Sequence, residues 1–148
     1  MIKHNIIQFL IMTIIGMLFN PMNMLAYKID HLYFSLTLFY GGLLMASNMI
    51  WSHEIVHFLS MGHFNLNSFL VGIFLSSFIV IFLLRKQLFV NKKQWLLRMI
   101  PHHSTALTTT NNIIKNKNAM KDKKMYKLSK EIIDTQEREI KLMKKLLF

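Results

Sequence analysis

The segment from Met99 to His103 combines residue types that could hold a metal ion. Met99 offers a thioether sulfur, and His102 and His103 offer two adjacent imidazoles directly after Pro101. Imidazole binds copper, zinc, iron and nickel, whereas a thioether selects soft Cu(I). The segment therefore predicts a transition-metal site, with copper as the preferred ion.

Further potential ligands lie near the C-terminus. On a helical wheel His103 falls inside the apolar stripe and His102 at its edge, while Glu139 and Met143 share the apolar face of a later helix with Gln136. A buried polar group costs about 1–3 kcal/mol unless it is hydrogen-bonded. Two interpretations stay open: these side chains bind metal, with Gln136 bonded to an imidazole, or the histidines only satisfy a polar core and methionine fills space.

Pro101 is expected to reshape the helix at this point. It lacks an N–H and leaves the carbonyl of Leu97 without its helical partner. We expect a bend that turns both imidazoles inward.

A second candidate group is a stripe of residues that recur every four positions. Its members are Met45, Met49, His53, His57 and Met61. On a helix this spacing gives a slowly drifting row along one side. It predicts either a soft-metal relay or packing methionines with histidines at a membrane interface.

Three apolar blocks must position these residues. The chain is 53% hydrophobic, and its mean hydropathy of +0.33 is typical of a membrane protein. The blocks cover about 6–27, 32–51 and 66–84, each near the ~20 residues that cross a bilayer. We expect a three-span membrane domain over residues 1–86, with the first span retained and kinked or ended at Pro21.

The charge is concentrated after the third block. Of 18 Lys and Arg residues only Lys3 and Lys28 precede Arg85, and the net charge is +11. The positive-inside rule predicts a cytoplasmic C-terminal region. No nucleic-acid-reading motif accompanies the charge, so no nucleic-acid partner is expected. The chain has no cysteine, which excludes disulfides and thiolate metal sites.

Residues 87–148 are expected to form an αα-hairpin. Apolar residues recur at helical spacing over about 90–114 and 123–147, and Asp122 is a plausible N-cap after a polar turn. Two amphipathic helices cannot close a core alone, so we expect a homo-oligomer, with two hairpins pairing into a four-helix bundle. Packing of the hairpin on the spans or on the bilayer surface is the alternative. The predicted fold is all-α.

The tail also resembles a known family, domain of unknown function 305. The resemblance rests on Met-Ile-Pro-His-His at 99–103, followed by Leu128, Ile132, Ile133, Gln136, Glu139, Ile140 and Met143. The hexapeptide Asp30 to Ser35 is similar to a membrane-anchored branch of that family. The resemblance implies a ferritin-like half-bundle and copper binding. Many soluble members carry Met where this chain has Thr109, which removes one thioether.

The expected function is that of a multi-pass membrane protein whose hairpin binds a transition metal, copper above all. The alternative is a structural or assembly protein whose tail dimerises. No nucleophile–base pair or cofactor fingerprint is recognisable, and Ser104 follows the histidines without an identifiable orienting carboxylate, so an enzyme is not expected.

Overall fold

The structure is a computed structural model that describes residues 2–116, 118 and 121–147. All regular elements in these ranges are helical, which confirms the all-α prediction. The chain divides into two compact units. One comprises Met1–Asn20 with Leu36–Val90, and the other comprises Pro21–Ser35 with Asn91–Phe148.

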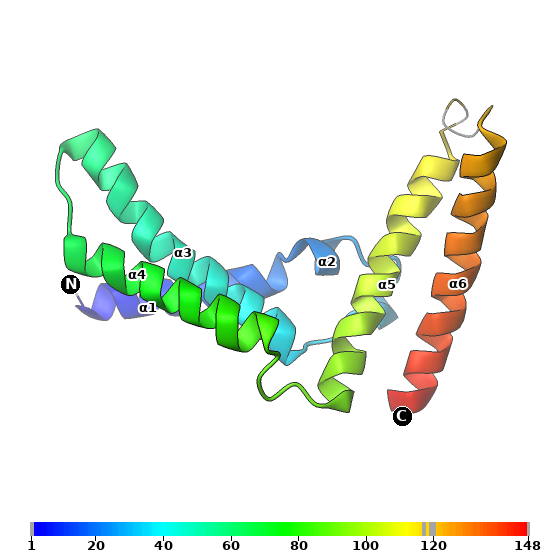
Figure 1. Ribbon diagram of the computed structural model, residues 1–148, viewed down its shortest axis with the longest axis horizontal. Helices are drawn as coiled ribbons and strands as arrows, with labels where there is room; N and C mark the ends of the chain where they lie inside the picture. The colour runs from blue at the N-terminus through cyan, green and yellow to red at the C-terminus, as the bar shows by residue number, and fades with distance from the viewer. Residues whose placement is uncertain (1, 117, 119–120, 148) are drawn as a thin grey trace. The chain divides into compact units, whose positions relative to one another are not determined.

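The first unit is built from three long helices. They are α1 (Ile2–Leu18), α3 (Leu36–Met61) and α4 (Leu66–Phe78), and α4 continues as the π-helical turn η2 (Ile79–Arg85). Helices α3 and α4 run antiparallel, and α1 packs on α3 (Figure 1). The Asn65 side chain caps α4 by accepting a hydrogen bond from the Ser68 N–H.

Glycines allow the three helices to approach closely. A Cβ added to Gly42 in α3 would lie 2.5 Å from the Thr13 carbonyl oxygen of α1. A Cβ added to Gly72 in α4 would lie 2.8 Å from the Trp51 nitrogen of α3. Such distances exclude any larger residue, so both helix pairs depend on backbone contact.

Within the part of the chain that the structure describes, two segments, rather than the expected three, are long and apolar enough to cross a membrane. They are Ile6–Met24 and Leu66–Arg85, which match the first and third expected spans. The expected second span falls within α3, which is long enough but does not meet the same criterion, because Asn48, Ser52 and His53 interrupt its apolar run. As expected, regular helix stops before Pro21: α1 ends at Leu18 and the short helix α2 (Pro21–Met24) begins at the proline.

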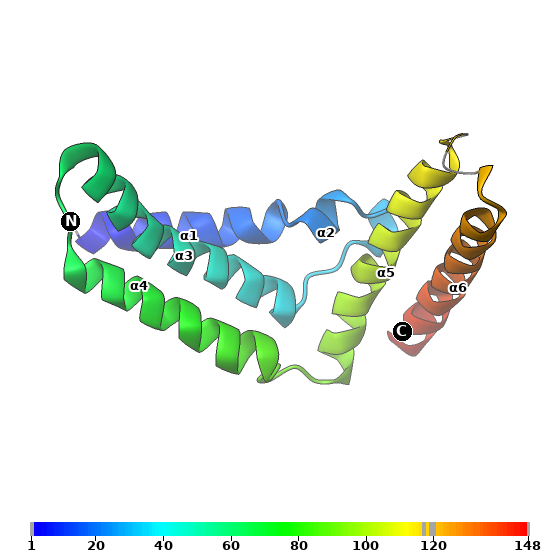
Figure 2. The same cartoon turned by 45° about the horizontal axis from the view of Figure 1, so that its top comes forward.

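The second unit contains the expected hairpin. Its long helices are α5 (Lys92–Ile114) and α6 (Lys123–Leu147), which lie antiparallel and side by side (Figures 1 and 2). Asn91 caps α5 through the Gln94 N–H, and Asp122 Oδ1 accepts from the Lys124 N–H at 2.8 Å, so Asp122 caps α6 as predicted. Residues 117, 119 and 120 of the predicted turn lie outside the described residues.

The hairpin core is small and lies between the two helices. Its buried members are Leu96, Ile100, Leu107, Ile140 and Met143. The expected domain boundary between residues 86 and 87 would assign residues 21–35 to the membrane domain and not to the hairpin. In the structure, residues 21–35 belong to the compact unit of the hairpin, and Tyr33 packs against the core. We call residues 21–35 the strap.

Candidate metal site on the C-terminal hairpin

His103 and Glu139 meet across the hairpin. The Nδ1 atom of His103 on α5 lies 3.0 Å from Oε2 of Glu139 on α6. The imidazole is largely buried, whereas the carboxylate is partly exposed at 41%. Gln136, one turn before Glu139, lies close enough to the same imidazole to raise its pKa slightly. The structure therefore brings together three of the residues singled out in the sequence.

Burial keeps the His103 imidazole neutral. Loss of solvent lowers the pKa of His103 from its ordinary value of 6.5, and this outweighs the opposing attraction of Glu139. A neutral imidazole has a lone pair available for a metal ion. The Nδ1 atom is buried and, among the described residues, makes no hydrogen bond, although the Glu139 carboxylate lies 3.0 Å away. The site thus holds a buried ligand atom whose hydrogen-bonding capacity is unmet.

His102 does not join this contact, contrary to the expectation that both imidazoles face inward. Its side chain is exposed, and its ring lies beside that of His103 with centroids 5.8 Å apart. Helix α5 continues without a break through the buried Pro101. Consecutive residues of a continuous helix point about 100° apart, so only one of the two histidines can face α6.

The two methionines take different places. Met143 is buried in the hairpin core, whereas Met99 is partly buried against that core. Met143 therefore packs as a core residue, and Met99 remains the more accessible thioether.

The described residues, 2–116, 118 and 121–147, contain no group of three or more His, Asp or Glu side chains that could hold a metal ion. His103 and Glu139 fit a transition metal in donor type, but they supply fewer protein ligands than the three or four of typical zinc centres. A complete site needs further donors from Met99, His102 or another molecule.

The strap meets the hairpin through a polar network that the sequence did not predict. Ser104 Oγ, which is 0% exposed, accepts a hydrogen bond from the Tyr27 N–H at 2.7 Å and lies 2.9 Å from Nδ1 of His31. Nearby, Lys144 on α6 pairs with Asp30 at 2.5 Å. Ser104 lies one turn after Ile100 and one turn before Leu107, and this spacing was the signal for its burial.

This network has the residue types of a hydrolytic triad but not its geometry. The distance of 3.8 Å between Asp30 Oδ1 and His31 Nε2 is too long for a hydrogen bond. Ser104 is fully buried, so no substrate can reach its hydroxyl. The network holds the strap to the hairpin.

The stripe on α3 is brought together only in part. The rings of His53 and His57 lie with their centroids 4.6 Å apart. Met45 packs against α1, with its sulfur 3.0 Å from where a Cβ on Gly16 would be. Met61 at the end of the stripe is 73% exposed. Met49 lies one turn before His53 on the same helix.

Comparison with known proteins decides the family. Residues 87–147 match the family described as Domain of unknown function (DUF305), and this range contains both helices of the hairpin and the contact between His103 and Glu139. The hairpin is a DUF305 domain. The DUF305 match begins just before α5 and ends at the last residue of α6.

A relative extends the similarity beyond the DUF305 hairpin. The uncharacterized protein L153 of Acanthamoeba polyphaga mimivirus is 33% identical over 129 residues, which cover 86% of this chain and 81% of that protein. No solved structure was found to match the chain.

Proposed function

We propose that this DUF305 protein is anchored in a membrane and binds a transition metal, copper above all, at His103, Glu139 and His102. The observation that carries the proposal is the buried Nδ1 of His103, which makes no hydrogen bond among the described residues and lies 3.0 Å from a carboxylate oxygen. Glu139 either binds the ion or orients the imidazole. Met99 would supply a soft donor, which favours Cu(I).

The incomplete ligand set supports a second copy as part of this site. Ser104 and His102 point to opposite sides of α5, because they are two positions apart on the helix. The strap covers the Ser104 side. The other side carries the exposed His102 together with exposed apolar residues, which are Trp95 and Ile113 on α5 and Leu128, Leu142 and Leu146 on α6.

Pairing two hairpins through this open face would cover its apolar residues. It would also bring the His102, His103 and Glu139 side chains of both copies to one interface. The result would be a four-helix bundle of the ferritin-like kind, with ligands on facing helices.

The strap also supports a multi-pass arrangement. Residues 21–35 and the hairpin belong to one compact unit, which favours an arrangement with both on the same side of a membrane. The chain between them must then cross an even number of times. If α4 crosses, α3 crosses as well, and its 26 residues are long enough to do so. The sixteen Lys and Arg residues from Arg85 onward favour the cytoplasm as that side.

One observation favours a different function. The described residues contain no group of three His, Asp or Glu side chains in a single copy. In the alternative, the hairpin is an assembly module, and His103 only satisfies Gln136 and Glu139 in a polar core.

Metal binding by the purified full-length protein in detergent separates the two functions. Wild type, His102→Gln and His103→Gln are titrated with Cu(I) and with Zn(II), and far-UV circular dichroism checks that each is folded. We expect His103→Gln to lose more affinity than His102→Gln, and Cu(I) to bind more tightly than Zn(II). Equally weak binding by wild type and His103→Gln would contradict the metal-binding function and favour the alternative, an assembly module.

A further inference from the structure

We propose that His53 and His57 form a second metal site, for a divalent ion that prefers imidazole, on the C-terminal part of α3. The ion of choice is Cu(II), which binds nitrogen ligands more tightly than the neighbouring divalent metals. This site belongs to the first compact unit, whereas the histidines of the DUF305 hairpin belong to the second. It therefore stands independently of the proposed function.

The spacing of the two histidines is that of a helical chelate. Residues four apart on a helix lie on the same face, one turn above the other. The structure places the two ring centroids 4.6 Å apart with an angle of 39° between the ring planes. Small rotations of both rings can aim one nitrogen of each at a common point, so the helix backbone holds the two ligands close together at no further cost in backbone entropy.

Neither imidazole is engaged elsewhere. Among the described residues, no group makes a hydrogen bond or ion pair with the imidazole of His53 or of His57. His53 is exposed and His57 is partly exposed, so an ion can reach both. Two unpartnered imidazoles on one exposed face are available to bind a metal.

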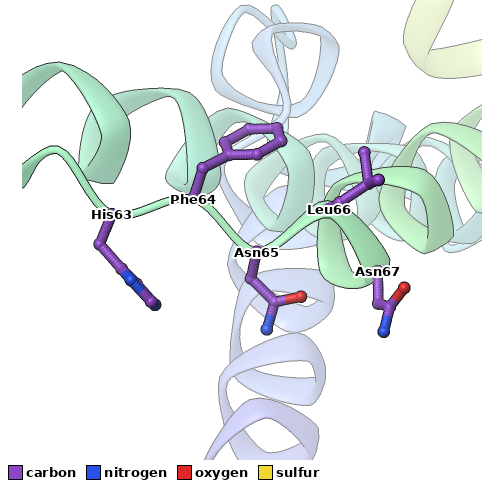
Figure 3. A pocket seen from close by; sticks show the side chains of 5 residues that line it. All are labelled: His63, Phe64, Asn65, Leu66 and Asn67. Atoms are coloured by element: carbon purple, nitrogen blue, oxygen red, sulfur yellow. The ribbon is translucent and has the colours of Figure 1, made fainter.

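The neighbouring polar residues are committed to the loop that follows α3. Glu54 Oε2 accepts a hydrogen bond from the Asn65 N–H at 3.1 Å, which fixes the carboxylate. Over the end of that loop and the first residues of α4, the side chains of His63, Asn65 and Asn67 point to one side, and Phe64 and Leu66 point to the other (Figure 3). These five residues line a shallow pocket of about 210 Å³. His63 makes no ring contact with the pair, so it is a matched control.

The test uses the full-length protein with His102 and His103 both replaced by Gln, so that binding at the hairpin cannot contribute. Cu(II) quenches tryptophan fluorescence at short range. Trp51 lies two residues before His53, and Trp95→Phe removes the other tryptophan. Quenching of Trp51 is followed during titration with CuCl2 in detergent, at pH 7.5 and at pH 5.5.

We expect saturable quenching that weakens at least about tenfold in His57→Gln and at pH 5.5, because protonated imidazole cannot bind a metal. His63→Gln should bind as the parent does. A register variant, Ile55→His with His57→Ile, keeps two histidines but places them two positions apart, about 200° around the helix, and should also lose the site. If that variant or His57→Gln binds as tightly as the parent, or if His63→Gln weakens binding equally, the proposal is wrong.

Discussion

His31 Nδ1 lies 2.9 Å from Ser104 Oγ, across 73 positions of the sequence. This pair joins the strap after the first candidate span to the helix that carries the DUF305 histidines. Because the Ser104 hydroxyl also accepts from the Tyr27 N–H, one buried side chain satisfies two groups of the strap.

Replacing Ser104 with Ala should loosen the strap. The change leaves the Tyr27 N–H and the His31 ring unsatisfied, at a cost of about 1–3 kcal/mol. Hydrogen exchange of the strap amides, measured by mass spectrometry in detergent, should accelerate by at least about fivefold. Ser60→Ala, which removes an exposed hydroxyl bonded only to the Val56 carbonyl, is the control and should leave the strap unchanged. Unchanged exchange in Ser104→Ala would show that the network does not hold the strap.

Acidification should weaken the hairpin unit. Burial, with the charge of Lys144 next, lowers the pKa of His31 below 6.5, and burial lowers that of His103 as well. The unfolded state then binds more protons, so this stability is complete above about pH 6.5 and declines as the pH falls below it. Urea unfolding at pH 7.5 and pH 5.5 measures the decline. His31→Asn should make the dependence of stability on pH smaller. If that dependence is unchanged, groups other than His31 cause it.

Glu139→Gln tests the carboxylate beside His103. If Glu139 orients the imidazole, the affinity for Cu(I) should fall roughly 10–100-fold. The change also removes the negative charge that raises the pKa of His103, so that pKa should fall further. Glu137→Gln is the matched control, because Glu137 is exposed two positions away. Equal effects of the two changes would argue against a role for Glu139 in metal binding.

Leu142→Asp tests self-association through the open face. Ile140 is unsuitable for this purpose because it is buried in the hairpin core, where a charge would unfold the hairpin itself. Leu142 is 55% exposed, so a charge there is tolerated in one copy but is desolvated in a dimer. Cross-linking in membranes should lose the dimer, whereas Lys141→Asp on the charged face should keep it. A dimer that survives Leu142→Asp would place the interface elsewhere.

Single-cysteine labelling tests the membrane arrangement, and the chain has no cysteine of its own. Lys28→Cys and Lys115→Cys should be protected together from a membrane-impermeant reagent in intact cells. His63→Cys, in the loop between α3 and α4, should react. If the Lys28→Cys and His63→Cys variants are both labelled while Lys115→Cys is protected, α3 does not cross the membrane.

The sequence by itself determined the helices and most of their ends. Periodicity and capping residues are local properties, so α6 begins after Asp122 and ends at Leu147 as predicted. The apolar runs located the first and third candidate spans. The motif around His103 with Gln136 and Glu139 also indicated which residues meet, because their positions on two wheels share a face.

Only the tertiary structure decided what each face of the hairpin contacts. The strap was unpredictable because the contact between His31 and Ser104 joins distant segments, and no periodicity connects them. A wheel places His102 at the edge of the stripe, but the continuity of α5 through Pro101 decided that it stays exposed. Local sequence fixes the direction of a side chain relative to its own helix, whereas the partner it meets depends on how the whole chain packs.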